Sequence, residues 1–104
     1  MNIQVHGFDW DAGNRDKCQK HGVSQKEIEH FFGQTEVYVT PDPKHSDEEE
    51  RFWAIGRSKK KKPMFVVFTL RAVKDEILIR PISARYMHEK EATRYEEESA
   101  KIKE

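Results

Sequence analysis

The sequence predicts an α+β fold, and three observations lead to this prediction. Two short stretches with helix-capping signals come first, at residues 9–20 and 24–33. The hydrophobic period then changes to two between residues 36 and 83, which is typical of strands. A charged segment, from about residue 87 to 102, favours a last helix. We therefore expect two helices, a mostly antiparallel sheet of about four strands and a C-terminal helix, in one domain over residues 1–104.

The chain begins with a predicted short strand over residues 3–8. Asp9 and Asp11 follow it and offer capping side chains for the first helix, which is expected to run to about Lys20. Gly22 suits the position after this helix, because glycine adopts a positive φ at little cost.

The strongest local signal marks the start of the second helix. Ser24 and Glu27 have the spacing of a capping box, and Val23 and Ile28 stand where a hydrophobic staple would pack. We expect a helix that ends near Gly33 and buries Ile28, Phe31 and Phe32.

The sheet is predicted from four segments, at residues 36–40, 51–57, 64–70 and 76–83. Residues 64–70 form a continuous apolar run, which is typical of a strand in the middle of a sheet with both faces covered. Residues 59–63 read as a turn. Pro81 has no amide donor, so it must lie at a sheet edge or a bulge.

The composition describes a small protein with a thin core. The 12.3 kDa chain is 37% charged, has a mean hydropathy of −0.95 and contains only 22 Leu, Ile, Val and Phe residues. We expect the acidic N-terminal block or the C-terminal helix to support assembly with a partner. No apolar run approaches the roughly 18 residues of a membrane span. The single cysteine, Cys18, excludes an internal disulfide, and we expect a cytoplasmic protein.

Charge is segregated along the chain, although it sums to zero. The net charge is −6 over residues 1–50, +8 over residues 51–85 and −2 over residues 86–104. If the basic side chains of the middle block converge, they produce a field that attracts phosphates. For Lys59–Lys62 alone, a solvated hairpin tip is the simpler interpretation.

Three segments in register resemble a known protein family. They are Phe8–Asp11 leading through Asn14 to Lys20–Ser24, then Glu50–Ser58, and then Arg80–Arg85 followed by Glu91–Glu96. Together they are similar to the BrnT toxins of bacterial type II toxin–antitoxin systems. The resemblance implies a RelE-like fold, ribonuclease activity on RNA, and neutralisation by a BrnA-type antitoxin. That antitoxin carries a ribbon-helix-helix part, through which alone the complex would contact operator DNA. Whether the toxin also forms a homodimer is left undecided by the sequence.

Metal-free cleavage of RNA needs a base for the 2′-hydroxyl, an acid for the leaving oxygen and cations for the phosphorane. The resemblance points to catalytic residues at Lys20, His21, Arg51 and Arg85, with Arg80 as a further candidate. We interpret His21 as the proton carrier and Arg51 with Arg85 as the phosphate clamp. The predicted nucleic-acid contacts are Arg57, Lys59, Lys60, Lys61, Lys62 and Trp53. No metal or cofactor is expected, since the histidines lack ligand spacing.

Each candidate also has a structural interpretation. His21 could interact with the carbonyls at its helix end, Arg51 could pair with the acidic run 47–50, and Arg85 could pair with Glu89. Packing is preferred to base stacking for Trp53, and a solvated turn is preferred for Asp42 and its acidic neighbours.

The alternative function is a catalytically inactive RelE-like binding module that acts through protein or nucleic-acid contacts. Convergence of Lys20, His21, Arg51 and Arg85 in one cleft would favour the enzyme.

Overall fold

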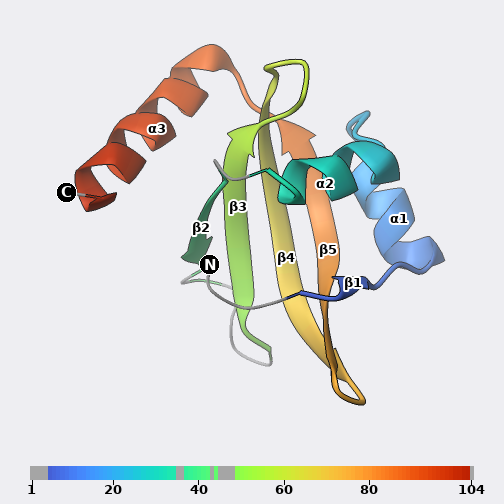
Figure 1. Cartoon of the computed structure of the whole chain (residues 1–104). Helices are drawn as coiled ribbons and strands as arrows, with labels where there is room; N and C mark the ends of the chain where they lie inside the picture. Colours follow the sequence, from blue (N-terminus) through green and yellow to red (C-terminus); the bar gives the residue numbers. More distant parts are fainter. Residues whose placement is uncertain (1–4, 35–36, 43, 45–48, 104) are drawn as a thin grey trace.

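The computed structural model describes residues 5–34, 37–42, 44 and 49–103, and it confirms the α+β class (Figure 1). Its strands form one sheet in the order β1-β5-β4-β3-β2, with all neighbours antiparallel except β1 and β5. Among these residues, no helix is long and apolar enough to cross a membrane. The elements in chain order are β1 (Gly7–Phe8), α1 (Ala12–Gln19), α2 (Gln25–Phe32), β2 (Tyr38–Pro41), β3 (Arg51–Arg57), β4 (Pro63–Val73), β5 (Glu76–Tyr86) and α3 (Glu89–Lys103).

Side-chain caps determine where both N-terminal helices begin. Asp11 accepts a hydrogen bond from the Asn14 N–H at 3.0 Å, and the Asn14 side chain accepts one from the Asp11 N–H at 2.7 Å. Ser24 caps α2 by accepting from the Glu27 N–H at 3.1 Å. The Glu27 carboxylate does not complete the expected capping box, because it accepts a hydrogen bond from the Tyr86 hydroxyl. Gly22 has a φ of 86°, as predicted.

Within the described residues the sheet has five strands and not about four, because residues 7–8 join it by pairing parallel to Leu78 and Ile79 of β5. The strand predicted over residues 3–8 is therefore only two residues long in its described part, and residues 1–4 lie outside the described residues. The strand predicted over 51–57 is confirmed, whereas that over 36–40 is observed at Tyr38–Pro41, with residues 35–36 not described.

The two faces of the sheet are covered unequally. Met64, Val66 and Phe68 of β4 are fully buried under α1 and α2. On the opposite face, Phe65 and Val67 are only partly buried. β4 is the central strand of the described sheet, as predicted, and this second face is only partly covered, although Thr69 on it is 2% exposed. We call this second side the open face.

Helix α3 covers part of the open face. Ala92 and Tyr95 pack with Ile55 and Phe65, and the rest of the helix extends away from the sheet (Figure 1). This agrees with the prediction of a charged C-terminal helix from about residue 87 to 102.

Pro81 stands at a β-bulge, as its missing amide donor predicts. Phe68 pairs with Pro81, but the preceding residue Val67 pairs with Ser83, so Ile82 is the extra residue. The bulge reverses the alternation of β5. As a result, Arg80 and Arg85 face the same side of the sheet, although their positions in an unbroken strand would place them on opposite sides.

Asn14 ties α1 to this bulge. Its side-chain amide donates to the Pro81 carbonyl at 2.8 Å and to the Asp9 carbonyl at 3.0 Å, and the residue is 5% exposed. This buried side chain is therefore one of the contacts that position α1 against β5.

We expect Asn14→Ala to destabilise the fold by about 3 kcal/mol, because it leaves the buried Pro81 carbonyl without its donor and removes the side-chain oxygen that accepts from the Asp11 N–H in the capping box of α1. Urea unfolding followed by circular dichroism measures the change. Arg15→Ala on the exposed side of α1 is the control and should cost less than about 0.5 kcal/mol. Equal midpoints for the two variants would contradict the role of Asn14.

Candidate functional site

Several predicted site residues line one cavity of about 500 Å³ between α1 and the open face, which we call the groove. Phe65 and Val67 of β4 form part of its wall. Lys20, His21 and Arg51 meet in it, whereas Arg85, the fourth residue whose convergence would favour an enzyme, does not line it. The side chains that line the groove are Lys17, Lys20, His21, Asp42, Arg51, Trp53, Phe65, Val67, Ile82 and Ser83.

Simple periodicities place these groups. Lys17, Lys20 and His21 have the i, i+3, i+4 spacing of one helix face, and Lys20 is the C-cap of α1. Arg51 and Trp53 alternate along β3, so both stand on the open face. Lys20 and His21 are exposed, whereas Arg51 and Trp53 are half-buried. The groove therefore combines solvent-accessible groups from α1 with groups held by the sheet.

A second cavity, of about 400 Å³, adjoins the groove and shares Lys17, Arg51 and Ile82 with it. Arg80 lines this cavity, as does Arg71. Arg51, Arg71 and Arg80 of the basic middle block therefore lie together with Lys17 of α1, in a cavity that Asp11 and Glu49 also line.

Arg80 is held in place by two carboxylates. Its guanidinium lies 2.8 Å from Asp11 and 3.4 Å from Asp9. The hydrogen bond to Asp11 raises the pKa of Arg80. The Asn14 backbone N–H, together with Arg80, lowers the pKa of Asp11, so the pair stays charged. Arg80 thus joins β5 to the start of α1 besides bordering the cavity.

Arg85 lies outside the residues that line the groove. Its guanidinium makes two hydrogen bonds to the Glu91 carboxylate, at 3.0 and 2.8 Å, and stands 4.8 Å from the centre of the Phe65 ring. The hydrogen bond to Glu91 raises the pKa of Arg85. The intrachain partner is thus Glu91 and not Glu89. Because Phe65 itself lines the groove, Arg85 stands at its border.

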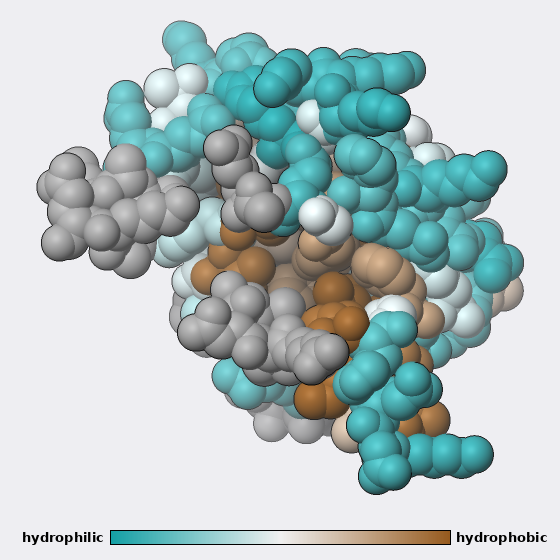
Figure 2. All heavy atoms as spheres, viewed as in Figure 1, coloured by the Kyte–Doolittle hydropathy of each residue, from teal (hydrophilic) through white to brown (hydrophobic). Residues whose placement is uncertain are grey.

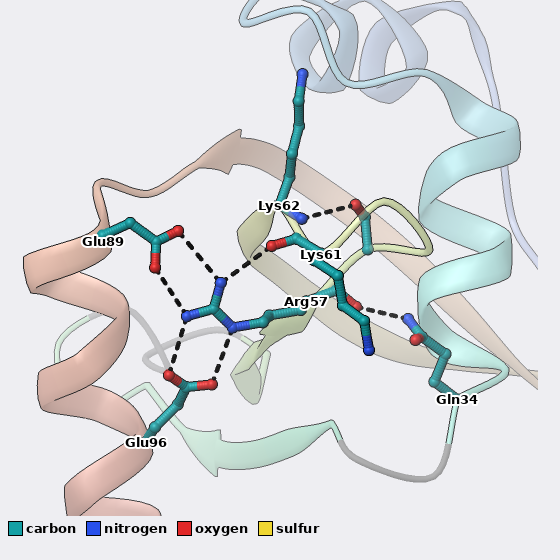
Figure 3. Close-up of polar contacts among 7 residues, drawn as sticks. Gln34, Arg57, Lys61, Lys62, Glu89 and Glu96 are labelled. Atoms are coloured by element: carbon teal, nitrogen blue, oxygen red, sulfur yellow. Dashed lines mark hydrogen bonds and ion pairs between the residues drawn. The ribbon is translucent and has the colours of Figure 1, made fainter.

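Arg57 is paired with two carboxylates of α3 (Figure 3). Its guanidinium hydrogen-bonds to Glu89 at 3.0 and 3.2 Å and to Glu96 at 3.1 and 3.2 Å, and these bonds raise its pKa. It also donates to the Lys61 carbonyl at 3.0 Å. Among the described contacts, Arg57 is therefore occupied in fastening α3 to the β3–β4 turn.

Residues 59–62 form that turn, and none of them lines the groove. Trp53 lines the groove and also packs on Phe65, with ring centroids 5.5 Å apart. Its packing interpretation is thus confirmed, while a contact with nucleic acid stays a prediction.

Two charged residues that line the groove were not predicted as site residues, Lys17 and Asp42. Lys17 could have been found from its helical spacing to Lys20 and His21. Asp42 was interpreted as part of a solvated turn, but it is only 3% exposed and lies beside Arg51, whose carbonyl accepts a hydrogen bond from the Asp42 N–H at 2.8 Å. This burial depends on pairing next to β3, which has no local sequence signal. Residues 45–48 of the same loop lie outside the described residues.

Cys18 is a packing residue, and the described residues contain no metal-binding cluster. Cys18 is fully buried, and burial raises the pKa of its thiol to about 11, which fits its structural interpretation. Within the described ranges, no group of three or more His, Cys, Asp or Glu side chains is arranged to hold a metal ion.

Comparison with known proteins gives one family. A search of curated proteins found no match. The family of ribonuclease toxins called BrnT, of type II toxin–antitoxin systems, matches residues 10–91. This range covers most of the chain and includes the groove residues together with Arg80, Arg85 and α1. The protein is a member of the BrnT family of type II ribonuclease toxins.

Proposed function

We propose that the protein is a RelE-like endoribonuclease that cuts RNA without a metal ion, by attack of a 2′-hydroxyl on the adjacent phosphate. The observation that carries this proposal is the meeting of Lys20, His21 and Arg51 in one groove. The reaction requires a base, an acid and cations at one phosphate; we assign the proton transfer to His21 and the positive charge to Lys20 and Arg51.

In this mechanism, His21 moves a proton between the 2′-hydroxyl and the leaving 5′-oxygen. The O–P bond to the 2′-oxygen forms as the bond to the 5′-oxygen breaks, which leaves a 2′,3′-cyclic phosphate and a 5′-hydroxyl. Arg51 binds phosphate oxygens with its forked donors, and Lys20 adds a second positive charge. Both cations stabilise the additional negative charge of the phosphorane.

The arginines of β5 have supporting parts in this proposal. Arg80 contributes to the field of the groove from the adjoining cavity while it positions α1 through Asp11. Arg85 acts on the phosphate from the border of the groove, after exchanging part of its contact with Glu91.

The family implies an antitoxin as the protein partner. We propose that it is of the BrnA type, with a ribbon-helix-helix part through which the complex binds operator DNA, and that the toxin acts in the cytoplasm.

Incubation of the purified chain with a structured RNA in excess EDTA tests the proposal. We expect fragments with a 5′-hydroxyl and a cyclic phosphate. RNA that stays intact, with and without ribosomes, would contradict the proposal and favour the inactive binding module. Cleavage that stops in EDTA and returns with a divalent cation would contradict the metal-free mechanism.

A further inference from the structure

A further basic cavity, of about 430 Å³, lies between α2 and the β3–β4 turn. Four lysines line it, together with His30. They come from two separate elements, since Lys26 belongs to α2 and Lys59, Lys60 and Lys62 belong to the turn. We call it the lysine cavity. Figure 2 shows that hydrophilic side chains gather at this end of the molecule, while the hydrophobic ones lie toward the middle.

Lys59–Lys62 are all exposed, as expected for a solvated tip, and Ser58 organises the backbone of their turn. Ser58 is 3% exposed, and its hydroxyl accepts hydrogen bonds from the N–H groups of Lys60 and Lys62, both at 3.3 Å. Its own N–H donates to the Lys62 carbonyl at 2.8 Å. Lys61 takes a φ of 66° and is not among the residues that line the cavity; its side chain points away from that of Lys62 (Figure 3). The backbone therefore directs three of the four lysines into one cavity.

The wall of the cavity is fixed by Tyr86. Its hydroxyl donates to Glu27, the one carboxylate among the lining residues, and Lys62 Nζ lies 4.9 Å from the centre of its ring. Burial, together with Glu27, raises the pKa of Tyr86 to about 12, so the phenol stays neutral at physiological pH. Four lysines and one carboxylate leave a net charge of +3 in the cavity before His30 is counted.

The lysines of this cavity differ from the chain's well-ordered arginines. Arg57, Arg80 and Arg85 each have carboxylate partners from this chain. By contrast, the part of the chain that the structure describes provides no ion-pair partner for Lys26, Lys59, Lys60 or Lys62. Positive charge that the protein leaves uncompensated in a concave site favours an anion from outside.

The lysine cavity and the groove each have a lining residue in the connection between α1 and α2. His21 lines the groove and Ser24 lines the cavity. Because three residues of extended chain span at most about 11 Å, these two points are near neighbours. A ligand that follows the connection between α1 and α2 can contact both cavities.

We propose that the lysine cavity binds backbone phosphates of the RNA that flank the phosphate cut in the groove; this inference rests on the proposed function. Hydrated lysine ammonium groups bind phosphates as point charges and do not read the base sequence. The cavity thus lengthens the RNA footprint and strengthens binding for any sequence. An acidic segment of the antitoxin is the competing occupant, and the experiment separates the two.

The test measures affinity for a single-stranded RNA with 2′-O-methyl groups, which cannot be cut by this mechanism, over a range of salt concentrations. We expect Lys26→Gln and Lys60→Gln each to weaken binding several-fold and to reduce the slope of log affinity against log salt by about 0.7 per lost phosphate contact. Lys74→Gln is the matched control, because Lys74 is an exposed lysine in the turn at the other end of β4 and does not line the lysine cavity. It should match the unmodified protein.

Failure of this inference can be told apart from failure of the proposed function. Unmodified protein that cuts RNA, combined with Lys26→Gln and Lys60→Gln variants that bind like Lys74→Gln, would overturn the lysine cavity and leave the function standing. Salt-dependent binding that needs Lys26 and Lys60, without any cutting of ordinary RNA, would support the cavity and contradict the function. Variants that lose only antitoxin affinity would assign the cavity to a protein partner and overturn the inference.

Discussion

Replacing His21 with alanine is expected to reduce RNA cleavage by about 10²- to 10⁴-fold, the range for loss of a general acid or base. His21 is exposed at the end of α1 and has no buried contact to lose, so the variant should keep the stability of the unmodified protein. The rate of appearance of 5′-hydroxyl ends under single-turnover conditions measures the change.

His88→Ala provides the matched control for this experiment. His88 is also exposed and lies directly before α3, outside the groove. We expect its cleavage rate to equal that of the unmodified protein. A His21→Ala protein that is folded and cuts at the unmodified rate would remove His21 from the mechanism and move the proton transfer to Lys20 or to water.

Replacing Arg51 with glutamine is expected to reduce cleavage by about 10²-fold, because one charged donor to the phosphorane is lost. Arg51 borders both the groove and the adjoining cavity, so it is the arginine best placed to bind the phosphate that reacts. Arg51→Lys keeps the charge but loses the fork of donors, and its rate should fall between those of the glutamine variant and the unmodified protein.

Arg94→Gln tests whether any loss of positive charge has the same effect. Arg94 is exposed on α3 and lines neither the groove nor the adjoining cavity. We expect no change in its cleavage rate, and thermal unfolding of all three variants checks that each is folded. If Arg51→Gln and Arg94→Gln lose activity equally, Arg51 contributes only to the net charge and does not bind the phosphate.

Much of the fold is encoded in short stretches of sequence. The caps at Asp11 and Ser24, the positive φ of Gly22 and the bulge at Pro81 were all predictable, because each depends on residues within a few positions. A strand near residues 7–8 was predicted, but its place in the sheet was not predictable, because these two residues of β1 pair with a partner about 70 positions away.

The candidate site divides in the same way. The sequence by itself determined which residues share a helix face or a strand face, and so placed Lys20 beside His21 and Arg51 beside Trp53. The tertiary structure decided that these two pairs meet, through the Asn14 contact that holds α1 against β5. It also decided that Arg85 and Arg57 are engaged by carboxylates of α3. The physical reason is that helical and strand periodicities are local, whereas register, helix docking and ion pairing depend on contacts between residues distant in sequence.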